Sequence, residues 1–410
     1  MKRENLPDRW ANIKLLLGFC CVVAFTVDAA GQGFKWDGEA YGYLSGMDLQ
    51  VDSLLNPDNQ IANLPEKSAI AELRLNLRAR WDKLRMSMRP ILLAQENRND
   101  LQEWQHNDAY LSQWLISFQA ANNLNLNGGR EILNWGPAQF RSLTSPFYFD
   151  NGRDNPLQEL SGIDSAWLLW SPNREQSLSL TWVSGSGHNQ EEIWHDTVLL
   201  KAESRGDEWA GGLILSQTPD LKPFAGLYVQ YTVSDALLVY TESASLTYAD
   251  ALRLHTDESQ PFTIESESPR RTNTLLGAAY TLENGQSINL EYLHYRHGYD
   301  EQEEAAYFAA AEASPLWAAQ ALAYAPPLLG RDYLYLVWQS NPLNTTGYWR
   351  LMATHNFTDN SQKYSAYIEY RVSDSITLFA LGEVTHGDVR QEFSSLYRST
   401  GTLGLKMALP

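Results

Sequence analysis

The chain is poor in cysteine, with Cys20 and Cys21 as the only two among its 410 residues. Both lie in an N-terminal stretch that we expect to be removed, so the mature chain would have no disulfide, thiolate metal site or cysteine nucleophile. Long apolar runs are also missing, because no stretch after residue 30 has the ~18 uninterrupted apolar residues of a membrane-spanning helix. The sequence therefore predicts no helical membrane span.

Motifs for catalysis and cofactor binding are absent as well. The chain has no GxSxG motif, P-loop, dinucleotide fingerprint or nucleic-acid-binding module. Its histidines are scattered, and His294 and His297 would point to opposite faces of a strand, which makes a poor metal pair. We expect no catalytic residue, metal or cofactor and no nucleic-acid partner. The alternative is an outer-membrane lipase or protease, which would need Ser or Asp beside a His near the outer rim.

The first 29 residues read as a secretory signal peptide. Lys2, Arg3, Arg9 and Lys14 precede the apolar run LLLGFCCVVAFTV, and small residues follow around Ala29. A buried helix is one alternative. A lipid-modified Cys20 is another, but Phe19 is bulky for that position. We therefore predict a signal peptide over 1–29 and one domain over 30–410.

The stretch RLNLRARWDKLRMSMR, residues 74–89, alternates bases with apolar residues on both sides of a short turn. Side chains alternate across a strand, so this is a hairpin with one apolar and one cationic face. Lipid suits the first face and a watery lumen the second. With 14 Trp and 21 Tyr in the chain, this pattern predicts a transmembrane antiparallel β-barrel.

The same alternation recurs along the chain and predicts about eighteen strands. The predicted strands are 34–45, 70–81, 83–93, 108–120, 124–136, 162–171, 176–185, 195–205, 209–217, 223–233, 236–248, 270–282, 286–298, 331–340, 347–357, 362–372, 375–386 and 396–409. Short turns rich in Asn, Asp and Gly alternate with long loops, which would place the short turns in the periplasm and the long loops outside. Trp81, Trp170 and Trp209 beside short turns would form an interfacial girdle. The barrel as a whole would be in contact with outer-membrane lipid and lipopolysaccharide.

The outer connections carry two further signals. The Ala-rich loop 299–330 predicts a helix interrupted near Pro315. That helix could cover the pore, contact a partner or form an inert lid. Acidic residues gather in outer loops, where they either solubilise the rim or bind divalent cations.

One wall of the lumen should be rich in bases, because strand 18 closes on strand 1. The bases expected there are Lys35, Arg74, Arg78, Arg80, Lys83, Arg85, Arg89, Arg350, Arg371, Arg398 and Lys406. The acids expected on the same wall are Asp37, Glu39, Glu72, Glu369 and Glu383. Either these charges form an ion-pair network that keeps the lumen polar, or the excess of bases guides an anionic solute or polymer.

The fifth predicted strand contains two adjacent glycines and is followed by a long loop. Gly128 and Gly129 predict a bulge that would aim Arg130 into the pore. The following loop, 137–161, mixes aromatic residues with charges that include Arg141 and Arg153. A loop this apolar is predicted to fold into the barrel and narrow it, and an ordered outer cap is the alternative.

The segment GREILNWGP, residues 129–137, after an alternating strand and before a long loop, resembles the outer-membrane barrels of the alginate-export family and a barrel family found beside RND-type exporters. The resemblance covers residues 108–165. It implies an eighteen-stranded barrel with an arginine-containing lumen that passes an anionic polysaccharide, and Arg130 is the matching residue.

These observations lead to a first functional hypothesis, the export of an anionic exopolysaccharide through a partly arginine-lined lumen. A substrate-specific porin for small anionic solutes is the main alternative. A scaffold for a secretion or efflux complex, with a periplasmic partner, is the third. Spacing and charge alone leave all three open.

Overall fold

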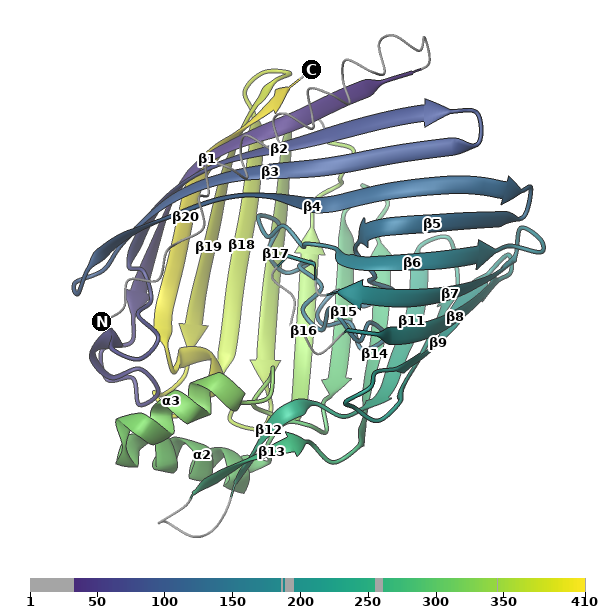
Figure 1. The fold of residues 1–410 in the computed structure, drawn as a ribbon. Coiled ribbons are helices and arrows are strands. Elements are labelled where there is room, and N and C mark those ends of the chain that lie inside the picture. Colours follow the sequence, from purple (N-terminus) through teal and green to yellow (C-terminus); the bar gives the residue numbers. More distant parts are fainter. Residues whose placement is uncertain (1–32, 186, 189–194, 255–260, 345, 410) are drawn as a thin grey trace, which may run out of the picture.

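The computed structural model describes residues 33–185, 187–188, 195–254, 261–344 and 346–409, so the predicted signal peptide lies outside the described residues. The described chain forms a closed antiparallel barrel of eighteen strands (Figure 1). The barrel strands are β1 (Lys35–Leu49), β2 (Lys67–Trp81), β3 (Leu84–Arg98), β4 (Glu103–Ala121), β5 (Leu124–Glu131), β6 (Ile163–Trp170), β7 (Gln176–Gly185), β8 (Thr197–Arg205), β9 (Trp209–Gln217), β10 (Phe224–Thr232), β11 (Leu237–Leu246), β14 (Arg271–Thr281), β15 (Ser287–His294), β16 (Asp332–Gln339), β17 (Gly347–Asn356), β18 (Gln362–Arg371), β19 (Ile376–His386) and β20 (Tyr397–Leu409). Each pairs with its neighbours along the barrel, and β20 pairs with β1 to close it.

Every predicted strand corresponds to one of these eighteen, so the predicted fold is confirmed. The turn between β2 and β3 places Asp82 at a positive φ of 40°, a conformation that Asp tolerates better than most residues. The main difference lies in the predicted loop 249–269, which contains a separate hairpin of β12 (Ala249–Leu254) and β13 (Phe262–Glu267). Because this hairpin stands outside the barrel, β11 pairs directly with β14.

Alternating burial along the strands separates the two faces of the wall. On β7, Leu180 and Trp182 are exposed while Thr181 and Val183 are buried. An exposed row of apolar side chains such as Leu180 and Trp182 is favourable when it faces lipid. The inner face on this side is also largely apolar, in contrast to the wet lumen that alternation alone predicts. It is apolar because a loop packs against it from inside.

Two helices cover one end of the barrel, opposite the end at which the chain finishes (Figure 1). The helix α2 (Glu301–Ala313) begins with a capping box at Asp300, and α3 (Pro315–Tyr324) begins at Ser314, so the predicted break near Pro315 is confirmed. They pack on the β12–β13 hairpin and on Leu55. Two short 3-10 turns, η1 (Pro57–Asn59) and η3 (Glu392–Ser394), complete the same end. No helix of the described chain is both long and apolar enough to span a membrane.

Candidate functional site

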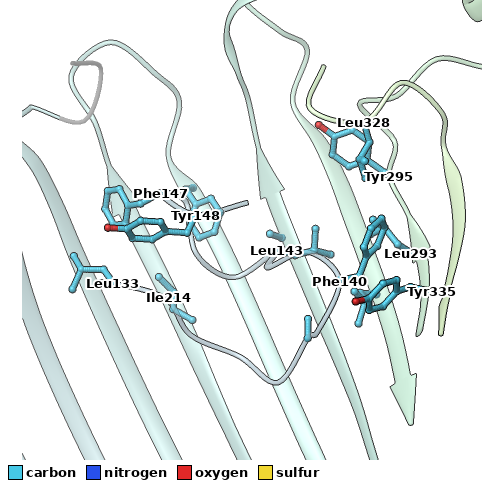
Figure 2. Packing of buried hydrophobic residues seen from close by; sticks show 14 of the residues in the cluster. Leu133, Phe140, Leu143, Phe147, Tyr148, Ile214, Leu293, Tyr295, Leu328 and Tyr335 are labelled. Carbon is cyan, nitrogen blue, oxygen red and sulfur yellow. The ribbon is translucent and has the colours of Figure 1, made fainter. Parts of the chain in front are cut away.

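The loop between β5 and β6, residues 132–162, runs inside the barrel. Phe140, Leu143 and Tyr148 are buried there among wall residues such as Ile214 and Tyr335 (Figure 2). The rings of Phe140 and Tyr335 stack with centroids 4.9 Å apart. The prediction that residues 137–161 fold into the barrel is therefore confirmed, and the apolar inner wall is the surface that receives them.

Two fully buried wall carboxylates hold the backbone of this loop, here called the lumen loop. Glu242 on β11 accepts hydrogen bonds from the backbone N–H groups of Ala138, Leu143 and Thr144 at 2.9–3.2 Å, and from the Thr144 hydroxyl. Glu291 on β15 accepts from the N–H groups of residues 139 and 140 and from the Tyr240 hydroxyl. The paired acceptors satisfy backbone donors that would otherwise be buried without a partner.

A second attachment joins the lumen loop to the opposite wall. Glu159 lies 2.7 Å from the Nε of Arg89 and 3.2 Å from Arg74, and the Ser112 hydroxyl also donates to it. Arg74 further donates to the Leu157 carbonyl at 3.0 Å. The lumen loop is thus fixed on both sides of the barrel interior.

Arg141 and Arg153 act within the lumen loop itself. Arg141 lies over the Phe140 ring and forms an ion pair with Asp154 at 2.9 Å. Burial alone would raise the pKa of Asp154, but Arg141, with Lys363 of the facing wall, outweighs burial and lowers that pKa. Arg153 donates to the carbonyls of residues 137 and 138. Both arginines therefore shape the loop.

Several of the bases predicted on the lumen wall are paired with acids. Arg74 forms a bidentate pair with Glu72, and Lys406 lies 3.5 Å from Glu369. Arg78 pairs with Asp37, and Lys363, which the sequence analysis did not single out, pairs with Glu383. This part of the wall matches the ion-pair network rather than an unbroken cationic track.

Unpaired bases gather instead at the end with the short turns. Lys35, Arg80, Lys83, Arg85 and Arg371 are exposed there, and none has an acidic partner among the described residues. Arg80 and Arg85 face each other across β2 and β3, an arrangement of like charges that is unfavourable unless water or an anion lies between them. We call this cluster the mouth cluster.

Arg130 and Arg398, both predicted to line the lumen, do not take their predicted places. The pairing of β4 with β5 passes Gly128 and Gly129 without a register shift, so the predicted bulge is wrong. Arg130 stays opposite Trp114, on the side of the exposed Leu126, and pairs with Asp164 at 2.7 Å.

Arg398 is displaced by an irregularity between β1 and β20 and donates to Gln50 at 2.6 Å. Arg350, in contrast, faces inward on β17 as expected and is 9% exposed.

Sequence reasoning missed the loop anchors Glu242, Glu291 and Glu159. Each wall anchor is the lone acid in an apolar, alternating strand, VYTESAS or INLEYLH, and this signal could have marked it as a buried inward carboxylate. The sequence of those strands does not indicate which backbone amides of the loop each carboxylate would bind. No group of three His, Cys, Asp or Glu side chains within the described ranges is arranged to hold a metal ion.

The helical end contains a buried carboxyl group, Glu304, and a half-buried one, Glu392, and neither forms an ion pair with a base among the described residues. Glu304 of α2 lies near Asp359 and Glu392, and the Glu392 N–H donates to Asp359 at 2.6 Å. Burial, with repulsion from Asp359 and Glu392, raises the pKa of Glu304 to about 10. Burial raises the pKa of Glu392 to about 7. The nearby Arg331 already pairs with Asp300 and Glu303.

These pKa values predict that the helical end loosens as pH rises. Both carboxyls hold their protons more tightly in the folded state, so the stabilisation is complete below their ordinary pKa of 4.5 and declines as pH rises towards about 7 and about 10. Protection factors of the α2 and α3 amides in hydrogen exchange should be larger at about pH 6 than at about pH 9. Glu304→Gln should flatten this dependence, while Glu301→Gln on the exposed face of α2 should keep it. Equal protection at both pH values would contradict the prediction.

Comparison with known proteins supports the fold and leaves the sequence family open. No family model and no curated protein sequence matches the chain. Pseudomonas aeruginosa OccK5 (OpdH) has a similar structure, with a TM-score of 0.56, 9% identity, and coverage of 92% of this chain and 98% of that one. Pseudomonas aeruginosa OccK11 (OpdR) has a TM-score of 0.53 and 11% identity, with coverage of 92% of this chain and 96% of that one. Acinetobacter baumannii OccAB1 has a TM-score of 0.54 and 8% identity, with coverage of 91% of this chain and 96% of that one.

At these identities the likeness concerns the fold alone. The chain has the porin-like, eighteen-stranded barrel fold of these proteins. This fold agrees with the expected location in a bacterial outer membrane. The resemblance to alginate-export barrels gains no support from the comparisons.

Proposed function

We propose that this barrel is a passive, selective channel for small anionic solutes. The observation that carries the proposal is the lumen loop, which crosses the interior and is fixed to both walls by Glu242, Glu291 and Glu159. A loop held in this way limits the passage to solutes of modest size. Export of a polysaccharide, the first hypothesis from sequence, would require a wider path.

The charges along the remaining path favour selection rather than free diffusion. Acids of the loop, Asp154 and Glu159, face bases of the wall, Lys363 and Arg89. Glu159 and Arg89 are in direct contact at 2.7 Å, so the path runs along exposed wall charges such as Asp37 and Arg78, whose field orients a polar solute. Beyond them, the mouth cluster attracts anions at the end with the short turns.

Solute size and charge provide the test. Liposomes containing the purified protein should swell in arabinose or gluconate and should exclude uronic-acid oligomers. In planar bilayers the channel should prefer chloride to potassium. Passage of the oligomers would restore the export hypothesis, and a barrel closed to every solute and ion would favour the scaffold.

A charge-reversal variant tests whether the mouth cluster contributes to the preference. The double variant Arg80→Glu, Arg85→Glu should move the reversal potential of the channel towards the equilibrium potential of potassium. The change should be clearest at low salt, where screening is weak. Arg174→Glu, in the exposed short turn after β6, is the matched control and should leave it unchanged. An identical reversal potential in both variants would assign the selectivity to another part of the lumen.

A further inference from the structure

Five aromatic rings form a continuous strip on the inner wall of the barrel. They are Tyr41 and Tyr43 on β1, Tyr348 on β17, Tyr367 on β18 and Phe379 on β19. The ring centroids of Tyr348 and Tyr367 are 6.4 Å apart, and 6.4 Å also separates Tyr367 from Phe379. The Phe379 ring then lies 6.0 Å from Tyr43 and 6.3 Å from Tyr41. We call this row of rings the aromatic strip.

Gly404 of β20 lets the aromatic strip continue from β19 to β1. It lies between Phe379 and Tyr43 in the row of Cα partners. A Cβ at this position would lie 2.5 Å from the Phe379 ring and 2.5 Å from the Cβ of Tyr43, so a larger residue would push these side chains apart. Its neighbours Leu403 and Leu405 are exposed on the outer face, which places Gly404 and the strip on the inner face.

The aromatic strip lies on the charged side of the interior. None of its five rings belongs to the buried apolar cluster that packs on the lumen loop. Tyr367 and Phe379 are each 4% exposed and form the floor of the strip, whereas Tyr41, Tyr43 and Tyr348 are half-buried. Partly exposed rings on a wall that water reaches are a typical feature of a ligand-binding surface, where a few polar groups border an apolar one.

Charged groups border the strip within reach of a molecule that lies on it. Glu39 accepts a hydrogen bond from the Tyr41 hydroxyl at 2.9 Å, and Glu369 accepts one from Tyr367. Lys406 lies 3.5 Å from Glu369 and 4.0 Å from Glu39. The side chains of these three charged residues are 25–37% exposed. A carboxylate has about four acceptor positions, so Glu39 and Glu369 can also accept hydrogen bonds from the hydroxyl groups of a solute.

We propose that the aromatic strip binds the ring of a small saccharide in transit, a proposal that rests on the channel function and names the solutes as sugars and sugar acids. One face of a sugar ring presents C–H groups that pack on aromatic rings, while its hydroxyl groups donate to carboxylates. An acyclic polyol has the hydroxyl groups but no rigid apolar face. A small inorganic anion has neither, and Glu39 and Glu369 repel it.

Block of the single-channel current measures this binding in the assembled barrel. Methyl β-glucoside should reduce the current at a concentration about tenfold lower than sorbitol, the gain expected from contact with two or three rings. The double variant Tyr43→Leu, Tyr348→Leu keeps apolar side chains but removes two accessible rings, and should abolish this difference. The matched control, Tyr364→Leu with Tyr370→Leu, changes two exposed tyrosines on the lipid-facing side of β18 and should keep the difference.

Saturation-transfer NMR separates this inference from the proposed function. In a detergent without a sugar headgroup, irradiation of the protein's aromatic protons should transfer saturation to the ring protons of methyl β-glucoside but not to sorbitol. A barrel that passes no ion or solute would contradict the channel proposal. Equal transfer to both solutes in wild type, or undiminished transfer to the glucoside in the Tyr43→Leu, Tyr348→Leu variant, would overturn the saccharide site even in an open channel.

Discussion

The Glu242→Gln, Glu291→Gln double variant is expected to carry several times the single-channel current of the wild-type barrel. Glutamine has nearly the same size, but it lacks the charge and presents an N–H₂ group to the loop amides. Hydrogen bonds to a charged group contribute about 1.5–3 kcal/mol each, and the two carboxylates together accept such bonds from five backbone amides. Their loss should free the lumen loop from the apolar wall and widen the path.

The measurement is single-channel conductance, with limited proteolysis of residues 132–162 as a second readout. Glu203→Gln is the matched control, since Glu203 also faces inward, on β8, and bonds to Tyr228 and Lys201, but holds no amide of the loop. We expect the control to conduct like wild type. Unchanged current and unchanged protease resistance in the double variant would show that apolar packing, centred on Phe140 and Tyr335, holds the loop by itself.

The attachment of the lumen loop divides the interior into two unlike halves. From β6 to β17 the inner wall is mainly apolar and is covered by the loop. From β18 through β20 to β3 the inner wall is charged, and side chains such as Asp37 and Arg78 remain about half exposed. Water therefore reaches the charged side. A solute that follows the water passes along this charged wall, where Asp37 and Arg78 are accessible.

The strands could be predicted from sequence because lipid on one side forces alternation over each strand. Leu213 and Leu215 must be apolar to face lipid, and the short turns need Asn, Asp or Gly whatever the lumen contains. The interior could not be predicted in the same way. Ile214, between those two leucines, is buried because the lumen loop covers its side of the wall, and no local pattern on β9 records that contact.

The arginines show the same limit. Alternation placed Arg74, Arg89 and Arg350 correctly on the inner face. It did not show that Glu159, distant in sequence, pairs with the first two while Arg350 has no acidic partner within the described chain. For Arg130, adjacent glycines suggested a bulge, but the strand pairing stays regular and the side chain keeps its outward phase. Ion pairing depends on the folded loop, so the chain's −18 net charge gave no guide to it.

Removing the Arg74 side chain should destabilise the barrel more than any other single change on the charged wall. Its side chain is 6% exposed, lies over the Tyr41 ring, and pairs with Glu72 and Glu159. Arg74→Met would leave those carboxylates buried with fewer donors, and breaking a buried pair costs about 3–5 kcal/mol. The Arg74→Met, Glu72→Gln double variant should recover part of this loss, since it removes one of the stranded charges.

Urea-induced unfolding of the protein refolded into lipid vesicles measures the difference. Arg78→Met is the matched control on the same strand and face, because the Arg78 and Asp37 side chains are 58% and 43% exposed. Exposed pairs contribute about 0–1 kcal/mol, so this variant should unfold close to wild type. Equal stability of the two methionine variants would mean that water in the lumen takes the place of Arg74 beside Glu72 and Glu159, and that Arg89 is the arginine that anchors Glu159.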